Sequence, residues 1–388
     1  MNEDLVYITA RRKPLPEVVA SISQEVKELS RFVYTHPELG SEEYQAYDAF
    51  VSRLKSHNIK VQERYLDMDT AFLAEVGEGG PRVAVFAEYD ALPIGHACGH
   101  NLLGAWAYGV TLAFKKSPPR KGTLYLVGSP AEEGRGKYAS SKVVIAPKLK
   151  EMGVEAVFAV HPAGEWGVGG GLLATQRYQF VFHGRDAHPP SSGHLALNAL
   201  DAAVHFYIQA RMQRNQVRRE KDVIISAIIK DGGVAPNILP GRAEVWLDIR
   251  SNDSGYLPEL AQKIQAIAEG AAKMTGCTVE YKLLAPPTDS WKRNEGLERL
   301  MVKHASEYLE KFLTPEEAWS RPPVASADTA TVSQHIPSVH LSMKIGREGM
   351  PGHSQEWKEA AGTKEAEEAL MTAIAIGYEA VKDYCESH

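Results

Sequence analysis

The sequence lacks three features that mark particular classes of protein. No run of apolar residues approaches the roughly 18 that a membrane span needs, and the N-terminal residues 1–16 contain no apolar stretch typical of a signal peptide. The formal net charge of −6 comes without a basic block, which argues against binding to nucleic acid or to an anionic membrane. We therefore expect a cytoplasmic protein whose partners are small molecules.

Cysteine is also scarce. Cys98, Cys277 and Cys385 are far apart and odd in number, which argues against a disulfide framework and fits a reducing compartment. Cys277 and Cys385 are interpreted as small buried apolar residues. Cys98 differs because it lies within residues 96–100, His-Ala-Cys-Gly-His, where metal-binding side chains are crowded together.

The sequence does have the composition of a globular protein with more than one domain. Apolar residues make up 44% of its 388 residues and charged residues 24%, and this length exceeds what one core usually organises. Helical spacing of apolar residues from Pro16 to Tyr34 predicts an amphipathic helix. Apolar runs at 83–87, 124–127 and 157–160, separated by helical patterns, predict an α/β domain with a largely parallel, buried sheet.

The pattern changes around Ala174. Residues 175–286 predict the order strand, helix, strand, strand, helix, with a further strand at 281–284. This order is typical of a ferredoxin-like two-layer sandwich. A helix, a strand and a closing helix follow, so we predict a smaller domain inserted into a larger one, with segments 1–174, 175–286 and 287–388.

Chemically capable side chains follow each of the three predicted strands. They are Glu88, Asp90, Cys98 and His100 after the first, Glu132 and Glu133 after the second, and His161 at the end of the third. In open α/β sheets the ligand site lies beyond the carboxyl ends of the strands. We therefore expect these three segments to converge on one site.

The residue types in these segments favour a metal site. Cys98 and His100 are two residues apart, so in an extended loop both side chains can face the same side. Cysteine, histidine and carboxylate side chains are the ligands of zinc, and catalytic zinc sites keep a position open for water. Glu132 and Glu133 are adjacent, and successive side chains diverge, so one can bind metal while the other acts as a base.

Five segments taken together resemble the M20 metallopeptidases: residues 88–93, 96–101, 130–134, 161–162 and 352–354. Within that family they look most like subfamily D, which includes aminoacylases, p-aminobenzoyl-glutamate hydrolases and β-alanyl-lysine dipeptidases. The resemblance implies a zinc-peptidase-like α/β catalytic domain, whose mostly parallel sheet is flanked by helices. It also implies an inserted ferredoxin-like βαββα domain that acts as a lid and dimerises.

The resemblance also implies roles for individual residues. The implied metal ligands are Cys98, His100, Glu133, His161 and His353. Glu132 would be the general base, and Asp90 the carboxylate that orients a ligand. In the inserted domain, His188 would reach a neighbouring subunit's site, while Asn237 and Arg250 would hold the substrate's carboxylate. Arginine suits that task because its planar fork binds carboxylates through two hydrogen bonds.

These residues predict a metal-dependent hydrolase that cleaves an amide or peptide bond next to a free carboxylate. The expected substrates are N-acyl amino acids, aminobenzoyl-glutamate-like compounds or dipeptides, and the expected assembly is a homodimer or higher homo-oligomer. Two Zn²⁺ ions per subunit are expected because Cys98 offers a thiolate, although Mn²⁺, Co²⁺ or Ni²⁺ could also be accepted. Two alternatives stay open: a deacetylase or ureido hydrolase on the same scaffold, and a non-catalytic binding protein, which should have lost a ligand or the base.

Overall fold

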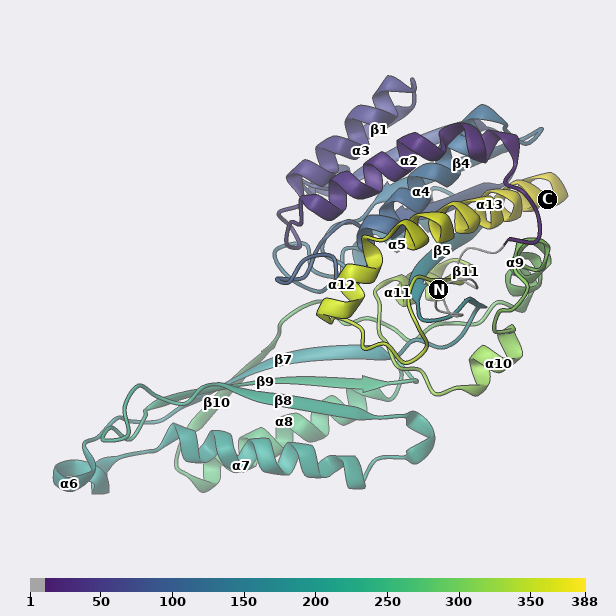
Figure 1. Cartoon of the computed structure of the whole chain (residues 1–388). Helices are drawn as coiled ribbons and strands as arrows, with labels where there is room; N and C mark the ends of the chain where they lie inside the picture. Colours follow the sequence, from purple (N-terminus) through teal and green to yellow (C-terminus); the bar gives the residue numbers. More distant parts are fainter. Residues whose placement is uncertain (1–10) are drawn as a thin grey trace. The chain divides into compact units, whose positions relative to one another are not determined.

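The computed structural model describes residues 11–388, which divide into two compact units (Figure 1). In the described chain, unit 1 comprises residues up to 171, 292–321 and 331–388, and unit 2 comprises 172–291 and 322–330. The chain therefore passes between the units four times. The inserted domain was predicted at 175–286. The second segment of unit 2, at 322–330, was not predicted.

The sheet of unit 1 is parallel at its centre and antiparallel towards its edges. In spatial order its strands are β1 (Lys60–Glu63), β2 (Phe72–Glu78), β4 (Gly122–Gly128), β3 (Arg82–Ala87), β5 (Ala156–Ala163), β11 (Ser338–Lys344) and β6 (Gly167–Val168). Strands β4, β3, β5 and β11 run parallel, as the apolar runs predict. Strands β1, β2 and β6 pair antiparallel and were not predicted.

Helices cover both faces of this sheet. They are α2 (Glu17–Thr35), α3 (Tyr44–Ser56), α4 (His100–Lys116), α9 (Glu295–Tyr308) and α13 (Lys364–Ser387) on one face, and α5 (Lys142–Glu151) and α11 (Thr329–His335) on the other. The shorter helices of unit 1 are η1 (Tyr65–Asp67), α10 (Pro315–Ser320) and α12 (Gln355–Ala361). Alternation along β3 serves both cores, because Val83 and Val85 pack on one face and Ala84 and Phe86 on the other.

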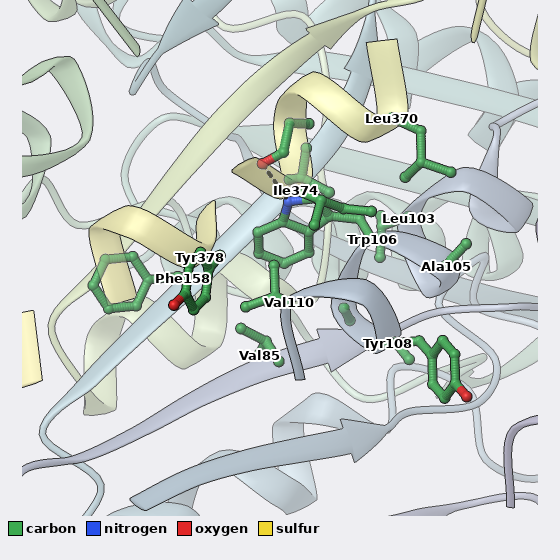
Figure 2. Close-up of a cluster of buried hydrophobic side chains, with 14 of the residues drawn as sticks. Val85, Leu103, Ala105, Trp106, Tyr108, Val110, Phe158, Leu370, Ile374 and Tyr378 are labelled. Atoms are coloured by element: carbon green, nitrogen blue, oxygen red, sulfur yellow. Dashed lines mark hydrogen bonds between the residues drawn. The ribbon is translucent and has the colours of Figure 1, made fainter. Parts of the chain in front are cut away.

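The larger core is centred on helix α4, which packs against the last helix of the chain (Figure 2). Trp106 is fully buried there, and its indole Nε1 donates a hydrogen bond of 3.0 Å to the carbonyl oxygen of Ala373. Gly377 makes room for the ring, since a Cβ at that position would lie 2.7 Å from it. The start of α4, which carries His100, is thereby anchored to the core.

Unit 2 is a four-stranded antiparallel sheet covered on one face by two helices, drawn in teal and green in Figure 1. Its elements are β7 (Ala174–His183), α6 (Pro189–Ser192), η2 (Gly193–Leu195), α7 (Ala199–Met212), η3 (Gln213–Asn215), η4 (Arg219–Lys221), β8 (Ile224–Asp231), β9 (Arg242–Ser251), α8 (Leu257–Met274) and β10 (Thr278–Leu283). The strand order β10-β7-β9-β8 is that of a ferredoxin-like βαββαβ sandwich.

Among residues 11–388, no helix combines the length and the apolar character that crossing a membrane requires.

Candidate metal centre

The parallel strands of unit 1 bring the predicted metal ligands to one edge of the sheet. Residues 88–90 follow β3 directly, residues 132–133 lie in the loop that follows β4, and His161 lies within β5 near its end. Cys98 and His100 lie where the chain enters α4, and His353 lies between β11 and α12. Since the carboxyl ends of adjacent parallel strands lie at the same edge, residues that are far apart in the sequence become neighbours there.

Two groups of potential ligands overlap at Cys98. One consists of Cys98, His100 and His161, and the other of Cys98, Glu133 and His353; within each group the ligand atoms lie within 4.8 Å of one another. Cys98 Sγ is 3.5 Å from His161 Nε2, and His353 Nε2 is 3.6 Å from Glu133 Oε1. The structure thus brings together all five predicted ligands as one continuous set.

Asp90 connects two of these ligands, as expected of a carboxylate that orients them. Its Oδ1 lies 3.0 Å from His100 Nδ1, and its Oδ2 accepts a 3.0 Å hydrogen bond from the backbone N–H of Glu133. Burial opposes ionisation of Asp90, but His100 and these hydrogen bonds outweigh it and lower the pKa of the carboxyl. With Nδ1 held in this way, His100 offers its Nε2 to a metal.

The donor set fits a bound cation. His100 Nε2 and Glu133 Oε1 are buried, and neither has a hydrogen-bond partner among the described residues; buried polar atoms normally have one. Burial raises the pKa of the Cys98 thiol to about 12, so a thiolate at this position needs a neighbouring positive charge. Thiolate, imidazole and carboxylate donors that converge in this way are those of zinc sites.

The predicted base lies beside the ligands. Glu132 Oε2 is 3.6 Å from His100 Nε2, and its side chain is 9% exposed. The neighbouring carboxylate, Glu133, belongs to the ligand group with His353. Consecutive residues therefore place one carboxylate in the group with Cys98 and His353 and the other next to His100.

A buried ion pair next to the site was missed by the sequence analysis. Lys142 Nζ is 2.9 Å from Glu88 Oε1, with side-chain exposures of 0% and 5%, and Glu88 Oε2 faces His100 Nε2 at 3.5 Å. Glu88, His100 and Glu132 form a further group of potential ligands. Glu88 stands in a segment that the sequence singled out, but nothing marks a lysine at the start of a helix as buried.

The other predicted site residues lie in unit 2: His188, predicted to be catalytic, and Asn237 and Arg250, predicted to bind the substrate. His188 and Asn237 are exposed. Arg250 is partly buried. Its Nε donates a 2.9 Å hydrogen bond to Asp248 Oδ2, and its Nη2 forms an ion pair with the same oxygen at 2.8 Å. Its Nη1 lies 3.5 Å from Ser326 Oγ. The catalytic role of His188 and the assignment of Asn237 and Arg250 to substrate binding stay predictions.

Comparison with known proteins supports the resemblance. Residues 66–383 match the profile described as peptidase family M20/M25/M40. The chain is 31% identical to a human Xaa-Arg dipeptidase over 387 residues, covering 94% of this chain and 87% of that protein. It is 30% identical to a subunit of the p-aminobenzoyl-glutamate hydrolase of Escherichia coli (strain K12) over 335 residues, covering 81% of this chain and 67% of that one.

The solved structures show the same fold. A dinuclear metal-binding peptidase of family M20 from Bacillus subtilis superposes with a TM-score of 0.68 at 21% sequence identity, covering 95% of this chain and 100% of that one. The family profile, the two relatives and the convergent ligand set agree with one another. This chain belongs to peptidase family M20.

Proposed function

We propose that the protein is a metal-dependent hydrolase that cleaves an amide or peptide bond next to a free carboxylate. One observation carries this proposal: Cys98, His100, Glu133, His161 and His353 form one donor set, with the carboxylate of Glu132 next to it. The names of the two relatives denote compounds in which an amino acid is joined through an amide bond. Dipeptides, aminobenzoyl-glutamate-like compounds and N-acyl amino acids are therefore the substrates to test.

Two Zn²⁺ ions are the proposed cofactor. The two overlapping ligand groups around Cys98 supply enough donors for two ions, and a thiolate favours zinc over harder cations. Bound there, the ions would polarise the scissile carbonyl and lower the pKa of the attacking water. Mn²⁺, Co²⁺ and Ni²⁺ remain alternatives that metal analysis of the purified protein would separate.

Glu132 is proposed to move the proton. In the ionised form it takes a proton from the attacking water, and the new C–O bond forms at the scissile carbonyl. The same carboxyl then gives that proton to the leaving nitrogen as the C–N bond breaks, which restores the carboxylate. Asp90 holds His100 and the backbone of Glu133 in place during both steps, so the geometry does not have to be rebuilt in each turnover.

The residues of unit 2 are proposed to bind the substrate. Asp248 holds Arg250 through Nε and Nη2, which orients the guanidinium. Its Nη1 makes a long contact of 3.5 Å with Ser326 Oγ, and we propose that a substrate carboxylate replaces this contact. Asn237 would add an amide donor to the same carboxylate. His188 would stabilise negative charge on the carbonyl oxygen, contributed by a neighbouring subunit.

We also propose that unit 2 mediates a homodimer. Strand β8 lies at an edge of its sheet and carries the exposed Ile224 and Ile228, and helix α7 exposes Ile208 and Met212. Unpaired strand edges with apolar side chains favour pairing with another chain. Light scattering on the purified protein tests this assignment: a monomer at micromolar concentration would exclude it.

The function is tested by assaying the full-length protein on a panel of substrates before and after chelation. The panel includes dipeptides with C-terminal arginine, p-aminobenzoyl-glutamate and N-acetyl amino acids. We expect hydrolysis that chelation abolishes and Zn²⁺ restores. If the metal-loaded protein hydrolyses nothing in the panel, the proposal is wrong. Product analysis separates the alternatives. A deacetylase would release acetate from the N-acetyl amino acids and leave the dipeptides and p-aminobenzoyl-glutamate intact, and a ureido hydrolase would release ammonia and carbon dioxide from an added N-carbamoyl amino acid.

A further inference from the structure

The residue before the proposed base has an unfavourable backbone conformation. Ala131 has φ +57°, in the left-handed region that residues with a Cβ seldom adopt. Such a conformation is strained and persists where the surrounding structure holds it in place. Because this residue sets the direction in which the chain enters Glu132 and Glu133, whatever maintains its conformation also aims those two side chains.

A buried carboxylate far away in the sequence holds this backbone. Glu43 is fully buried, and its Oε1 accepts hydrogen bonds from the backbone N–H groups of Ala131, at 2.8 Å, and Ser41, at 2.9 Å. Its Oε2 accepts from the hydroxyl of Thr70 at 2.8 Å. If Glu43 were removed, the buried N–H of Ala131 would lose this partner, and a buried donor without a partner is destabilising.

Other contacts join the same two segments. Ser41 Oγ accepts a 2.8 Å hydrogen bond from the backbone N–H of Tyr138. Gly40 allows close packing, since a Cβ there would lie 3.1 Å from the Cα of Ala131, and a Cβ on Gly136 would lie 2.5 Å from the carbonyl oxygen of Gly40. Residues 40–43 thus clasp the loop 131–138, with Glu43 contacting the residue next to the base.

We propose that Glu43 is a positioning residue of the active site. By binding the N–H of Ala131 it maintains the left-handed turn, so that Glu132 and Glu133 keep their diverging directions. The inference rests on the proposed function in one respect, namely that Glu132 is the base. Glu43 itself touches neither the ligand set nor the substrate in this assignment, and it acts through the backbone.

Three variants of the full-length protein test this inference. Glu43→Ala removes the acceptor, whereas Glu43→Gln keeps an oxygen for the two N–H groups and can donate its amide to Thr70. Glu38→Ala is the matched control, because the Glu38 carboxylate also accepts from two backbone N–H groups, those of Gln45 and Ala46 at 3.0 Å. Both N–H groups belong to the first turn of helix α3 rather than to the loop 131–138.

The readouts are hydrogen exchange in residues 131–138, metal content, kcat and KM. We expect Glu43→Ala to exchange at least about 10-fold faster in the loop and to lose about 10- to 100-fold in kcat with little change in KM, as small displacements of a catalytic group do. Glu43→Gln should recover both values to within about 3-fold, and Glu38→Ala should change neither. A folded Glu43→Ala protein with unchanged loop exchange and kcat would overturn the proposal, as would failure of Glu43→Gln to recover kcat.

One measurement needs no variant and covers the case in which Glu43→Ala does not fold. In the unaltered protein the amide of Ala131 should be protected from exchange as strongly as amides of the β4 strand, although it lies in a loop. Rapid exchange of that amide would contradict the proposal. The exchange results do not depend on the chemistry. Retained turnover in a Glu132→Gln variant would refute Glu132 as the base, and failure of the metal-loaded protein to hydrolyse the substrate panel would refute the proposed function, while either result would leave the clasp itself in place.

Discussion

The proposed chemical and binding residues differ in how firmly the structure holds them. In unit 1, His100 and Asp90 are buried, and Asp90 is hydrogen-bonded both to His100 and to the backbone of Glu133. In unit 2, His188 and Asn237 are exposed. A group that transfers protons or binds metal requires a fixed geometry, whereas a group that grips a substrate can adjust to it.

Arg250 stands between these two cases. It is partly buried and anchored by Asp248, and its Nη1 makes a long contact of 3.5 Å with Ser326 Oγ. If the difference between the units is functional, changes in unit 1 should reduce turnover, metal binding or stability. Changes to Asn237 or Arg250 in unit 2 should act on substrate affinity. The predictions below test this division, starting with the largest expected effect.

Neutralising the two adjacent carboxylates, one at a time, should have different consequences. Glu132→Gln should lower kcat by about 10³-fold, within the range typical of a lost general base, while the metal content stays unchanged. Glu133→Gln should lower the metal content itself, because Glu133 belongs to the ligand group. Elemental analysis beside steady-state kinetics checks both. Normal turnover in Glu132→Gln would show that another group is the base.

Removing the buried lysine should destabilise unit 1 strongly. Lys142→Met leaves the Glu88 carboxylate in a buried position without the ammonium group 2.9 Å away, which typically costs about 3–5 kcal/mol. The matched control is Lys148→Met on the same helix, where an exposed lysine pairs with Glu151 and the change should be small. Denaturant unfolding of both variants measures the difference. Equal midpoints would mean that the Lys142 pair contributes no more than a surface pair.

Glu43 should make the stability of the protein depend on pH. Burial, reinforced by the nearby Asp90, raises the pKa of Glu43 to about 7, above the unfolded value of 4.5, so the folded protein retains a proton that the unfolded chain releases. Its contribution to stability is therefore complete below about pH 4.5 and is lost as the pH rises through about 7. The shift corresponds to about 3 kcal/mol.

The comparison that isolates this contribution is the unaltered protein against Glu43→Gln, which cannot ionise. The difference in unfolding free energy between the two should change across about pH 4.5 to 7.5 in favour of the variant and be constant above that range. Urea unfolding at several pH values provides the measurement. A difference that does not vary with pH would mean that Glu43 ionises in the folded protein much as it does in the unfolded chain.

The substitution in unit 2 should have the smallest effect, and it should change KM rather than kcat or stability. Arg250→Ala should raise KM by about 10- to 100-fold, as expected for the loss of hydrogen bonds to a charged group, with kcat altered by much less. Initial rates over a range of substrate concentrations separate the two. If kcat fell as steeply as in Glu132→Gln, the division of labour between the units would be wrong.

The parts of the fold that the sequence predicted are those with a strong local pattern. The buried central strands appear as apolar runs because both faces of the sheet are covered, and the closing helix has a clear helical period. Strand β1, by contrast, has the sequence Lys-Val-Gln-Glu and is mostly exposed, so it gives no such signal. The membership of residues 322–330 in unit 2 could not be predicted either, because most of that segment is irregular.

The site was predicted as far as its residue types are distinctive. Cysteine and histidine in a short segment indicate a metal, and the resemblance to M20 enzymes supplied the remaining ligands. Glu43 and Lys142 were missed because charged residues are normally exposed. Glu43 follows Ser41 and Glu42, which is typical of a solvated loop. Only the tertiary structure shows that both side chains are buried.

The hydrogen bond between Trp106 and Ala373 joins residues that are 267 positions apart in the chain, and this has a consequence for biosynthesis. A ribosome completes residues 172–291 well before it makes helix α13, so the inserted sandwich can fold while the surrounding domain still lacks its last helix. During that interval, the apolar surface of helix α4 lacks helix α13, against which it packs in the folded protein. The nascent chain is therefore most exposed to aggregation on that surface until synthesis ends.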